Sequence, residues 1–215
     1  TGNDKSSKIV SHIHQVVIAP DHKHIVTNDL GTDKVWIYKY NPASKDNVLY
    51  DGKAFDVKTG SGPRHAVFCK NGKFFFLAHE LDGSVSAFSY KNGIIKLIQE
   101  TTVIRENNPK PWVADIHLSP DNKFLYVTNR APANDITCFK VSKNGKIDFV
   151  SQTKTEGDGP RNFAITPDGK YIFIGHQFTD NITIFRRDAE TGKMTNTGMQ
   201  INVGSPVCLI FMNKK

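Results

Sequence analysis

Short apolar segments and polar turns alternate along the whole chain in a unit that occurs four times. In each unit an apolar strand precedes a polar turn, a second strand follows it, and an alternating strand comes after another turn. The recurring turns are Pro20–Lys23, Lys70–Lys73, Pro120–Lys123 and Pro167–Lys170, and their lysines lie 50, 50 and 47 residues apart. Repeats of this length are typical of solenoids, propellers and helical arrays.

The residue types within each unit distinguish among these architectures. The apolar segments are rich in Val, Ile, Phe, Tyr and Thr, are bounded by Gly, Pro, Asn and Asp, and show no helical period. A fourth, more variable strand closes each unit, for example Leu97–Val103. Four short strands in about fifty residues make a propeller blade. The sequence therefore predicts an all-β fold, a single partial β-propeller domain over residues 1–215, with four-stranded antiparallel blades at about 9–57, 58–107, 108–157 and 158–204.

The end of the chain carries one more strand-like segment. Residues 205–211 match the first strand of a blade, but no second strand follows them. An unpaired strand edge is a feature that proteins normally avoid. Thr1–Lys8 is too short and too polar to supply the other strands, and the chain begins with Thr rather than Met. We therefore expect an open arc that needs N-terminal blades or a second chain to complete the propeller.

The composition of the chain limits the classes of binding partner that we expect. The chain has a net charge of +7, with 38% hydrophobic and 23% charged residues, and no apolar run near the ~20 residues of a membrane span. The lysines are scattered through turns rather than gathered with aromatic residues, so we expect neither a nucleic-acid nor a membrane partner. Cys69, Cys138 and Cys208 each lie in an apolar stretch, which predicts buried free thiols in a reducing, cytoplasmic compartment. No zinc-ligand spacing or glycine-rich phosphate loop occurs, so we expect no metal and no cofactor.

Two columns of polar residues appear when the blades are aligned on the lysine of the recurring turn. The first column, nine residues before that lysine at the start of the innermost strand, consists of His14, Arg64, Ala114 and Arg161. The second column, six or seven residues after it at the end of the next strand, consists of Asp29, Glu80, Arg130 and Gln177. The start of one strand and the end of its antiparallel neighbour lie at the same end of a blade. We therefore expect both columns to surround one mouth of the central channel.

These columns have a structural and a functional interpretation. Propeller blades often carry repeated polar residues that tie neighbouring blades together, but such a column tends to repeat one residue type. Here the type changes from blade to blade, which favours an asymmetric ligand. Three arginines at one mouth indicate an anion, and a His and a Glu beside them can serve general base catalysis. His117 is a weaker candidate for ligand contact, while His65 and Asp115 are expected to point toward neighbouring blades.

Several stretches resemble a known family. They are Ser61–His65, Ala78–Leu81, Ala114–Asp121, Val127–Arg130, Gly159–Phe163 and Ser205–Cys208. Together they are similar to the seven-bladed lactonase family, which includes the propeller-type 6-phosphogluconolactonase and the fungal carboxy-cis,cis-muconate lactonizing enzyme. The resemblance covers about residues 9–211. It implies that the active-site positions of the family fall on His14, Arg64, Glu80 and Arg130. The departure is in length, because the family has seven blades and this chain has four and a strand.

The predicted function is hydrolysis of a phosphorylated or carboxylated sugar lactone. His14, Glu80, Arg64 and Arg130 are the predicted catalytic residues, and Arg161, Asp29, Gln177 and His117 the predicted substrate-binding ones. Either His14 or Glu80 would activate a water, with an arginine stabilising the oxyanion. His14 is favoured because the ordinary pKa of histidine is about 6.5. Two alternatives stay open, a muconate-type lactonizing cycloisomerase and a non-catalytic propeller that serves as a binding platform.

Overall fold

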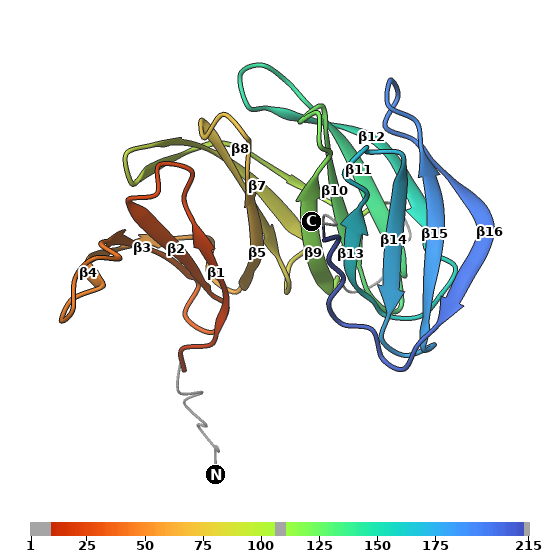
Figure 1. Cartoon of the computed structure of the whole chain (residues 1–215), viewed down its shortest axis with the longest axis horizontal. Coiled ribbons are helices and arrows are strands. Elements are labelled where there is room, and N and C mark those ends of the chain that lie inside the picture. Colours follow the sequence, from red (N-terminus) through yellow and green to blue (C-terminus); the bar gives the residue numbers. More distant parts are fainter. Residues whose placement is uncertain (1–9, 106–110, 213–215) are drawn as a thin grey trace, which may run out of the picture.

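A computed structural model describes residues 10–105 and 111–212, and in these ranges the regular structure is entirely β (Figure 1). Strands pair in sequence order into four antiparallel sheets of four. The first two sheets contain β1 (Ile13–Ile18), β2 (His24–Asp29), β3 (Lys34–Tyr40), β4 (Leu49–Asp56), β5 (Pro63–Phe68), β6 (Phe74–His79), β7 (Ser84–Lys91) and β8 (Ile94–Thr102). The other two contain β9 (Val113–Leu118), β10 (Phe124–Asn129), β11 (Asp135–Val141), β12 (Ile147–Lys154), β13 (Pro160–Ile165), β14 (Tyr171–His176), β15 (Asn181–Arg187) and β16 (Met194–Asn202). The predicted all-β fold with four-stranded antiparallel blades is confirmed.

The recurring turn has a simple chemical basis. In each sheet the side chain of its second residue accepts a hydrogen bond from the backbone N–H of the lysine two positions later. The acceptors are Asp21, Asn71, Asp121 and Asp168, at 2.9 to 3.1 Å. Asp and Asn favour turns because their short side chains can close such a ring. The lysine that marked the repeat is therefore the last residue of the turn, and the second strand of each sheet begins directly after it.

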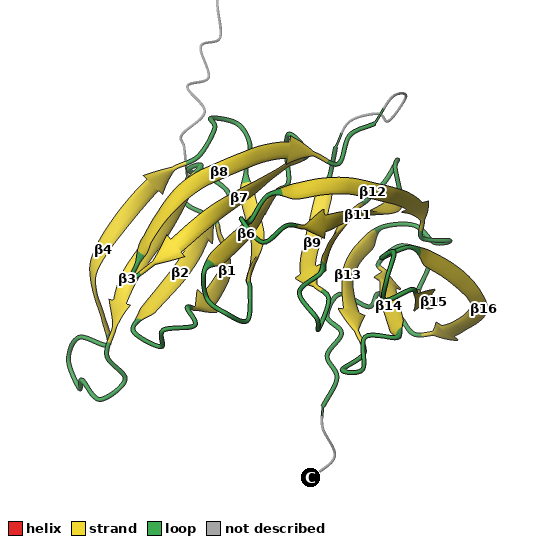
Figure 2. Ribbon diagram, turned by 90° about the horizontal axis from the view of Figure 1, so that it is seen from above, coloured by secondary structure: helices red, strands yellow, loops and turns green. Residues whose placement is uncertain are grey.

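The four sheets follow one another along an arc (Figure 2). Their inner strands β1, β5, β9 and β13 are neighbours in that order, and each junction between sheets has its own hydrophobic core. Leu77 and Phe88 pack at the first junction, Phe76 and Leu125 at the second, and Phe163 at the third. In the described residues the arc stays open between the first and the fourth sheet. The blade boundaries predicted at residues 9, 107 and 108 lie outside the described residues.

The predicted strand at 205–211 is not a strand in the structure, although it takes the place of one. The backbone N–H of Leu209 donates to Oδ1 of Asn162 in β13 at 2.6 Å, and the ring of Phe211 meets that of Phe173 edge-on at 5.3 Å. The segment thus lies on the outward face of the fourth sheet. With a single such backbone contact to β13, and no second strand beside it, a ladder of hydrogen bonds does not form.

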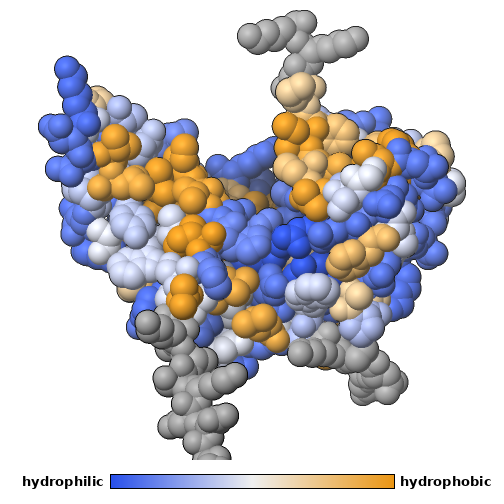
Figure 3. Space-filling model, turned by 90° about the horizontal axis from the view of Figure 1, so that it is seen from below, coloured by the Kyte–Doolittle hydropathy of each residue, from blue (hydrophilic) through white to orange (hydrophobic). Residues whose placement is uncertain are grey.

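The outward face of the first sheet has no such cover among the described residues. Val16 and Ile18 of β1 are 60% and 51% exposed. Trp36 and Tyr38 of β3 stack on each other at 6.1 Å, and the pairing register places all four side chains on one face. Figure 3 shows hydrophobic surface on both arms of the arc.

A buried guanidinium ties the fourth sheet to the third. Arg187 of β15 is 6% exposed. It donates to Oδ2 of Asp121 and to the Gly169 carbonyl, both at 2.9 Å, and to the Tyr126 hydroxyl at 3.1 Å. We predict that Arg187→Ala lowers the free energy of unfolding by about 3 kcal/mol, because it leaves the buried Tyr126 hydroxyl and Gly169 carbonyl without their donor.

The control for this prediction is Lys170→Ala. It removes an exposed ion pair with Asp168 at 3.6 Å, and exposed pairs contribute only about 0–1 kcal/mol. Urea denaturation of both variants measures the difference. Equal losses of stability in the two would contradict the structural role given to Arg187.

Candidate functional site

Each inner strand begins with a β-bulge, an extra residue without a partner on the next strand. In β1, Ile13 pairs with Asp29 and Gln15 with Asn28, which leaves His14 between them. The same irregularity recurs in β5, β9 and β13. The residues at the bulges are His14, Arg64, Ala114 and Arg161. Bulges re-aim side chains and are common beside active sites, so they turn the whole first column out of the alternation of the sheet.

The Gly-Pro-Arg motif sets up two of these bulges. Gly62 and Gly159 have φ values of +64° and +70°, which glycine adopts without strain. A Cβ on Gly62 would also lie 2.8 Å from Leu81, and one on Gly159 would lie 2.5 Å from Phe178. The carbonyl of each glycine accepts the backbone N–H of a second-column residue, Glu80 or Gln177. The motif therefore fixes the two columns against each other.

Glu80 lies between two buried arginines. Its Oε2 accepts from Nε of Arg64 at 2.6 Å, and its Oε1 pairs with Nη2 of Arg130 at 3.0 Å. Arg64 and Arg130 are 1% and 2% exposed. Arg64 also donates to the Ala114 carbonyl and Arg130 to the Trp112 carbonyl. Burial favours the neutral carboxyl, but Arg130 and Arg64 outweigh it and hold the pKa of Glu80 below its usual value.

Trp112 is a member of this site that sequence reasoning missed. Its indole Nε1–H donates to Oε1 of Glu80 at 2.9 Å, and the guanidinium of Arg130 lies 4.0 Å from its ring centroid. Such a stacked cation is stabilised by the ring quadrupole. Trp112 stands two positions before the first-column residue Ala114, outside both columns. The signal for Trp112 in the sequence was its position directly before the strand that begins beside the charged cluster.

His14 is half-buried and belongs to the same group. Its pKa is lowered to about 4, chiefly because burial removes the hydration of the imidazolium. The charges of Arg64, His65 and Arg161 lower the pKa further, whereas Glu80 raises it. Its Nδ1 is buried and has no hydrogen-bond partner among the described residues. At neutral pH the imidazole is therefore uncharged and able to accept a proton.

Arg161 and Gln177 form the accessible part of the group. Nη1 of Arg161 donates to Oε1 of Gln177 at 3.2 Å. In contrast to Arg64 and Arg130, Arg161 is only partly buried and has no carboxylate partner among the described ion pairs. The group contains three guanidiniums, which are cations in proteins, and burial, offset only partly by Glu80, lowers the pKa of Arg130 only to about 10. With one carboxylate among them, the cluster carries net positive charge.

Asp29 does not join this group, which corrects the alignment of the second column. Asp29 pairs with Ile13 just as His79 pairs with Pro63, so it matches His79 rather than Glu80. Its carboxylate accepts the backbone N–H groups of His12 at 2.7 Å and Gly31 at 3.1 Å. The residue that matches Glu80 is Leu30, whose N–H donates to the His12 carbonyl. The spacing of six rather than seven residues after the lysine was the signal of this one-residue slip.

His117 lies apart from the group. Its Nε2 pairs with Oδ2 of Asp115 at 3.0 Å, and its ring meets Phe163 edge-on at 4.8 Å. Burial disfavours the imidazolium, yet the Asp115 carboxylate outweighs this effect and raises the pKa of His117. We find no contact that brings His117 to Glu80 or to the arginines in the described ranges. Its expected contact with substrate stays a prediction without geometric support.

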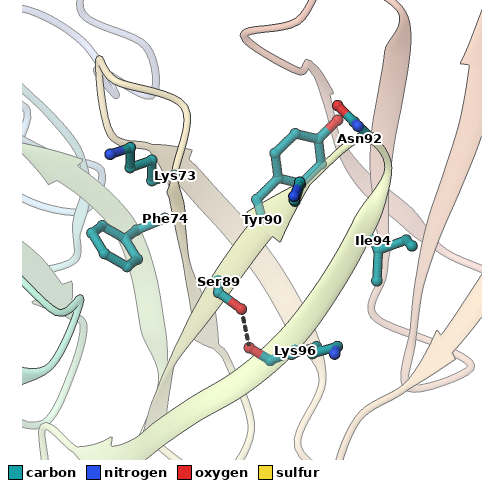
Figure 4. Close-up of a pocket in the computed structure, with 8 residues that line it drawn as sticks. Lys73, Phe74, Ser89, Tyr90, Asn92, Ile94 and Lys96 are labelled. Carbon is teal, nitrogen blue, oxygen red and sulfur yellow. Dashed lines mark hydrogen bonds between the residues drawn. The ribbon is translucent and has the colours of Figure 1, made fainter.

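Figure 3 shows hydrophilic side chains across the middle of the arc, between hydrophobic areas on its two arms. A cavity of about 510 Å³ lies at the β7–β8 hairpin (Figure 4). It is lined by Phe74, Tyr90, Ile94 and three lysines and includes none of the predicted site residues. Across the described ranges, no three His, Cys, Asp or Glu side chains are grouped as metal ligands, and no helix is present that could span a membrane.

Comparisons with known proteins identify the family of this chain. The family model of the seven-bladed β-propeller lactonases matches residues 1–211. The chain is 39% identical over 206 residues to a 6-phosphogluconolactonase of Formosa agariphila, covering 94% of this chain and 58% of that protein.

Solved structures agree as well. A crystal structure from Bacteroides fragilis superposes with a TM-score of 0.92 at 42% identity, covering 99% of this chain and 61% of that one. A periplasmic gluconolactonase of Pseudomonas aeruginosa superposes with a TM-score of 0.92 at 34% identity, covering 96% and 60%. The chain thus spans about three-fifths of the length of the relatives that it matches. It belongs to the lactonase family of seven-bladed β-propellers.

Proposed function

We propose that the protein hydrolyses an anionic sugar lactone of the 6-phosphogluconolactone type at the cluster of His14, Arg64, Glu80, Arg130 and Arg161. The observation that carries this proposal is a neutral imidazole beside an excess of buried positive charge. The relative from Formosa agariphila, which shares 39% identity, is a 6-phosphogluconolactonase, and this name supports the choice of substrate.

The reaction needs a proton acceptor, a cationic field and a grip on the substrate. His14 accepts a proton from water as the water oxygen bonds to the lactone carbonyl carbon. The arginines stabilise the negative charge that develops on the carbonyl oxygen. The ring C–O bond then breaks, and the ring oxygen takes up the proton from His14, giving the hydroxy acid. Glu80 is less suited to accept a proton, because both of its oxygens already pair with Arg64, Arg130 and Trp112; it holds Arg64 and Arg130 in place.

Arg161 has the role of anchoring the phosphate or carboxylate of the substrate. It is partly accessible, and its hydrogen-bonding partner Gln177 is neutral. Arginine binds such anions through two parallel hydrogen bonds. Arg64 is less suited to this task, since its guanidinium is already taken by Glu80 and Ala114.

We also propose that the outward face of the first sheet packs against another propeller blade, supplied by the same protein or by a second chain. Val16, Ile18 and Trp36 form an apolar face there, whereas the outward face of the fourth sheet is covered by residues 205–211. The prediction of a cytoplasmic protein is supported by Cys69 and Cys138, which are buried free thiols; Cys208, which was also predicted to be buried, is exposed.

The mutational prediction separates anchoring from catalysis. Arg161→Ala should raise KM for 6-phosphogluconolactone by roughly 10- to 100-fold with little change in kcat, because a charge-assisted hydrogen bond contributes about 1.5–3 kcal/mol. Arg186→Ala, an exposed arginine of β15, is the matched control and should leave both constants unchanged. Steady-state kinetics by pH release would refute the anchoring role if kcat fell and KM did not change.

The pH prediction follows from the neutral state of His14. In the free enzyme its pKa is about 4, so kcat/KM should fall only as the pH drops through about 4. A bound anion opposes the arginines that lower this pKa, so the acid limb of kcat should lie at higher pH than that of kcat/KM. His14→Gln should abolish both limbs and lower kcat by roughly 10²–10⁴-fold. An acid limb that persists in His14→Gln would assign the base to another group.

The packing prediction uses a charge placed on the outward face of the first sheet. In the intact protein, Ile18→Asp should lower the free energy of unfolding by about 2 kcal/mol or more if a blade covers the face. Ile94→Asp in β8, at 60% exposure against 51% for Ile18, is the control and should change stability by less than about 0.5 kcal/mol. Equal tolerance of both changes, measured by thermal unfolding, would show that the face is free.

A further inference from the structure

Asp115 is a buried carboxylate at the meeting point of three sheets. It follows the bulge of β9 and is 2% exposed. Its Oδ1 accepts from Nδ1 of His65 at 2.7 Å and from the N–H of Ile116 at 3.0 Å. Its Oδ2 accepts from Nε2 of His117 at 3.0 Å, Nδ2 of Asn162 at 2.6 Å and the N–H of Phe163 at 3.2 Å. Burial raises its pKa, but His117 and His65 outweigh burial and hold the pKa below its usual value, so the group is anionic.

A charge is more than the joining of the sheets requires. Gln15 stands at the equivalent position in β1, and its amide oxygen accepts the N–H of Ala66 in the next sheet at 2.6 Å. Asn162 does the same for Leu209 at 2.6 Å. Two neutral amides thus make the link that Asp115 makes to Phe163. Because burying a charge costs more than burying an amide, the carboxylate at this position calls for a second role.

His65 supplies that role. Its Nδ1–H points at Asp115, and this bond fixes both the tautomer and the plane of the ring. On its other side the ring meets His14 edge-on, with centroids 5.0 Å apart and an interplanar angle of 61°. His14 has no hydrogen bond at Nδ1 to hold its own ring within the described part of the chain. The packing of His65 is therefore the contact that orients it.

We propose that Asp115 and His65 form a positioning pair that holds the imidazole of His14 in place at the channel mouth. The effect of this pair on catalysis rests on the proposed function, whereas the contacts of His65 with Asp115 and His14 do not. Four groups face His14: Arg64 and His65 from β5, Glu80 after β6, and Arg161 from β13. Neither Asp115 nor His65 needs to touch the substrate in this arrangement.

The test is an NMR titration of the His14 imidazole in the intact protein. His65→Ala should raise the pKa of His14 by about half a unit or more, because it admits water and removes a neighbour that lowers this pKa. Asp115→Asn should shift it in the same direction, since His65 loses its anchor. Asn162→Ala removes a different donor from the same carboxylate and is the matched control; the His14 titration should not move.

Kinetics separate this inference from the proposed function. In His65→Ala, kcat should fall roughly 10- to 100-fold with KM nearly constant, as for a misplaced catalytic group. If the unaltered protein hydrolyses no lactone, the proposed function fails while the titration still tests the positioning pair. If the His14 titration is the same in folded His65→Ala as in the unaltered protein, the positioning pair is refuted. His65 is partly exposed, so this variant keeps the test open even if Asp115→Asn does not fold.

Discussion

The arrangement of the site depends on one carboxylate held between two buried guanidiniums. Arg64 comes from β5, Arg130 follows β10, and Glu80 joins them across the junction of the second and third sheets. Two arginines at 1–2% exposure could not remain buried without that carboxylate and the carbonyls around it. Because one carboxylate pairs with two guanidiniums, the cluster keeps an excess of positive charge. The scaffold is thereby stabilised in a form that attracts an anion.

The bulges give this electrostatic core its geometry. In a regular strand the residue at position 64 would follow the alternation of β5 and face a neighbouring sheet, as His65 does toward Asp115. One extra residue in each inner strand separates two tasks. The bulge residue turns toward the mouth, and the residue after it fastens one sheet to the next, as Gln15, His65, Asp115 and Asn162 do. Binding chemistry and sheet assembly therefore occupy adjacent positions of the same strand.

The four blades could be predicted from the sequence, because each recurring turn is a signal contained in a few consecutive residues. The Asp or Asn of each turn bonds its own backbone, so the repeat survives any change elsewhere and marks every blade. The site was less predictable where it depends on register. Asp29 seemed to belong with Glu80, yet the pairing of Ile13 with Asp29 puts Leu30 there instead. Trp112 and the segment at 205–211 depend on contacts between sheets, which a pattern along one strand does not encode.

The equivalence of the blades sharpens the meaning of their differences. The four bulge positions hold His14, Arg64, Ala114 and Arg161 on nearly the same backbone, so their side chains are free of the constraints that fix the turns. Where the scaffold alone decides, the first and fourth sheets use the same chemistry, as the amides of Gln15 and Asn162 show. Where a charge replaces the amide, at Asp115, the change lies directly behind the imidazole pair of His65 and His14. The departures from the repeat in this protein thus gather at the starts of the inner strands, where the proposed site lies.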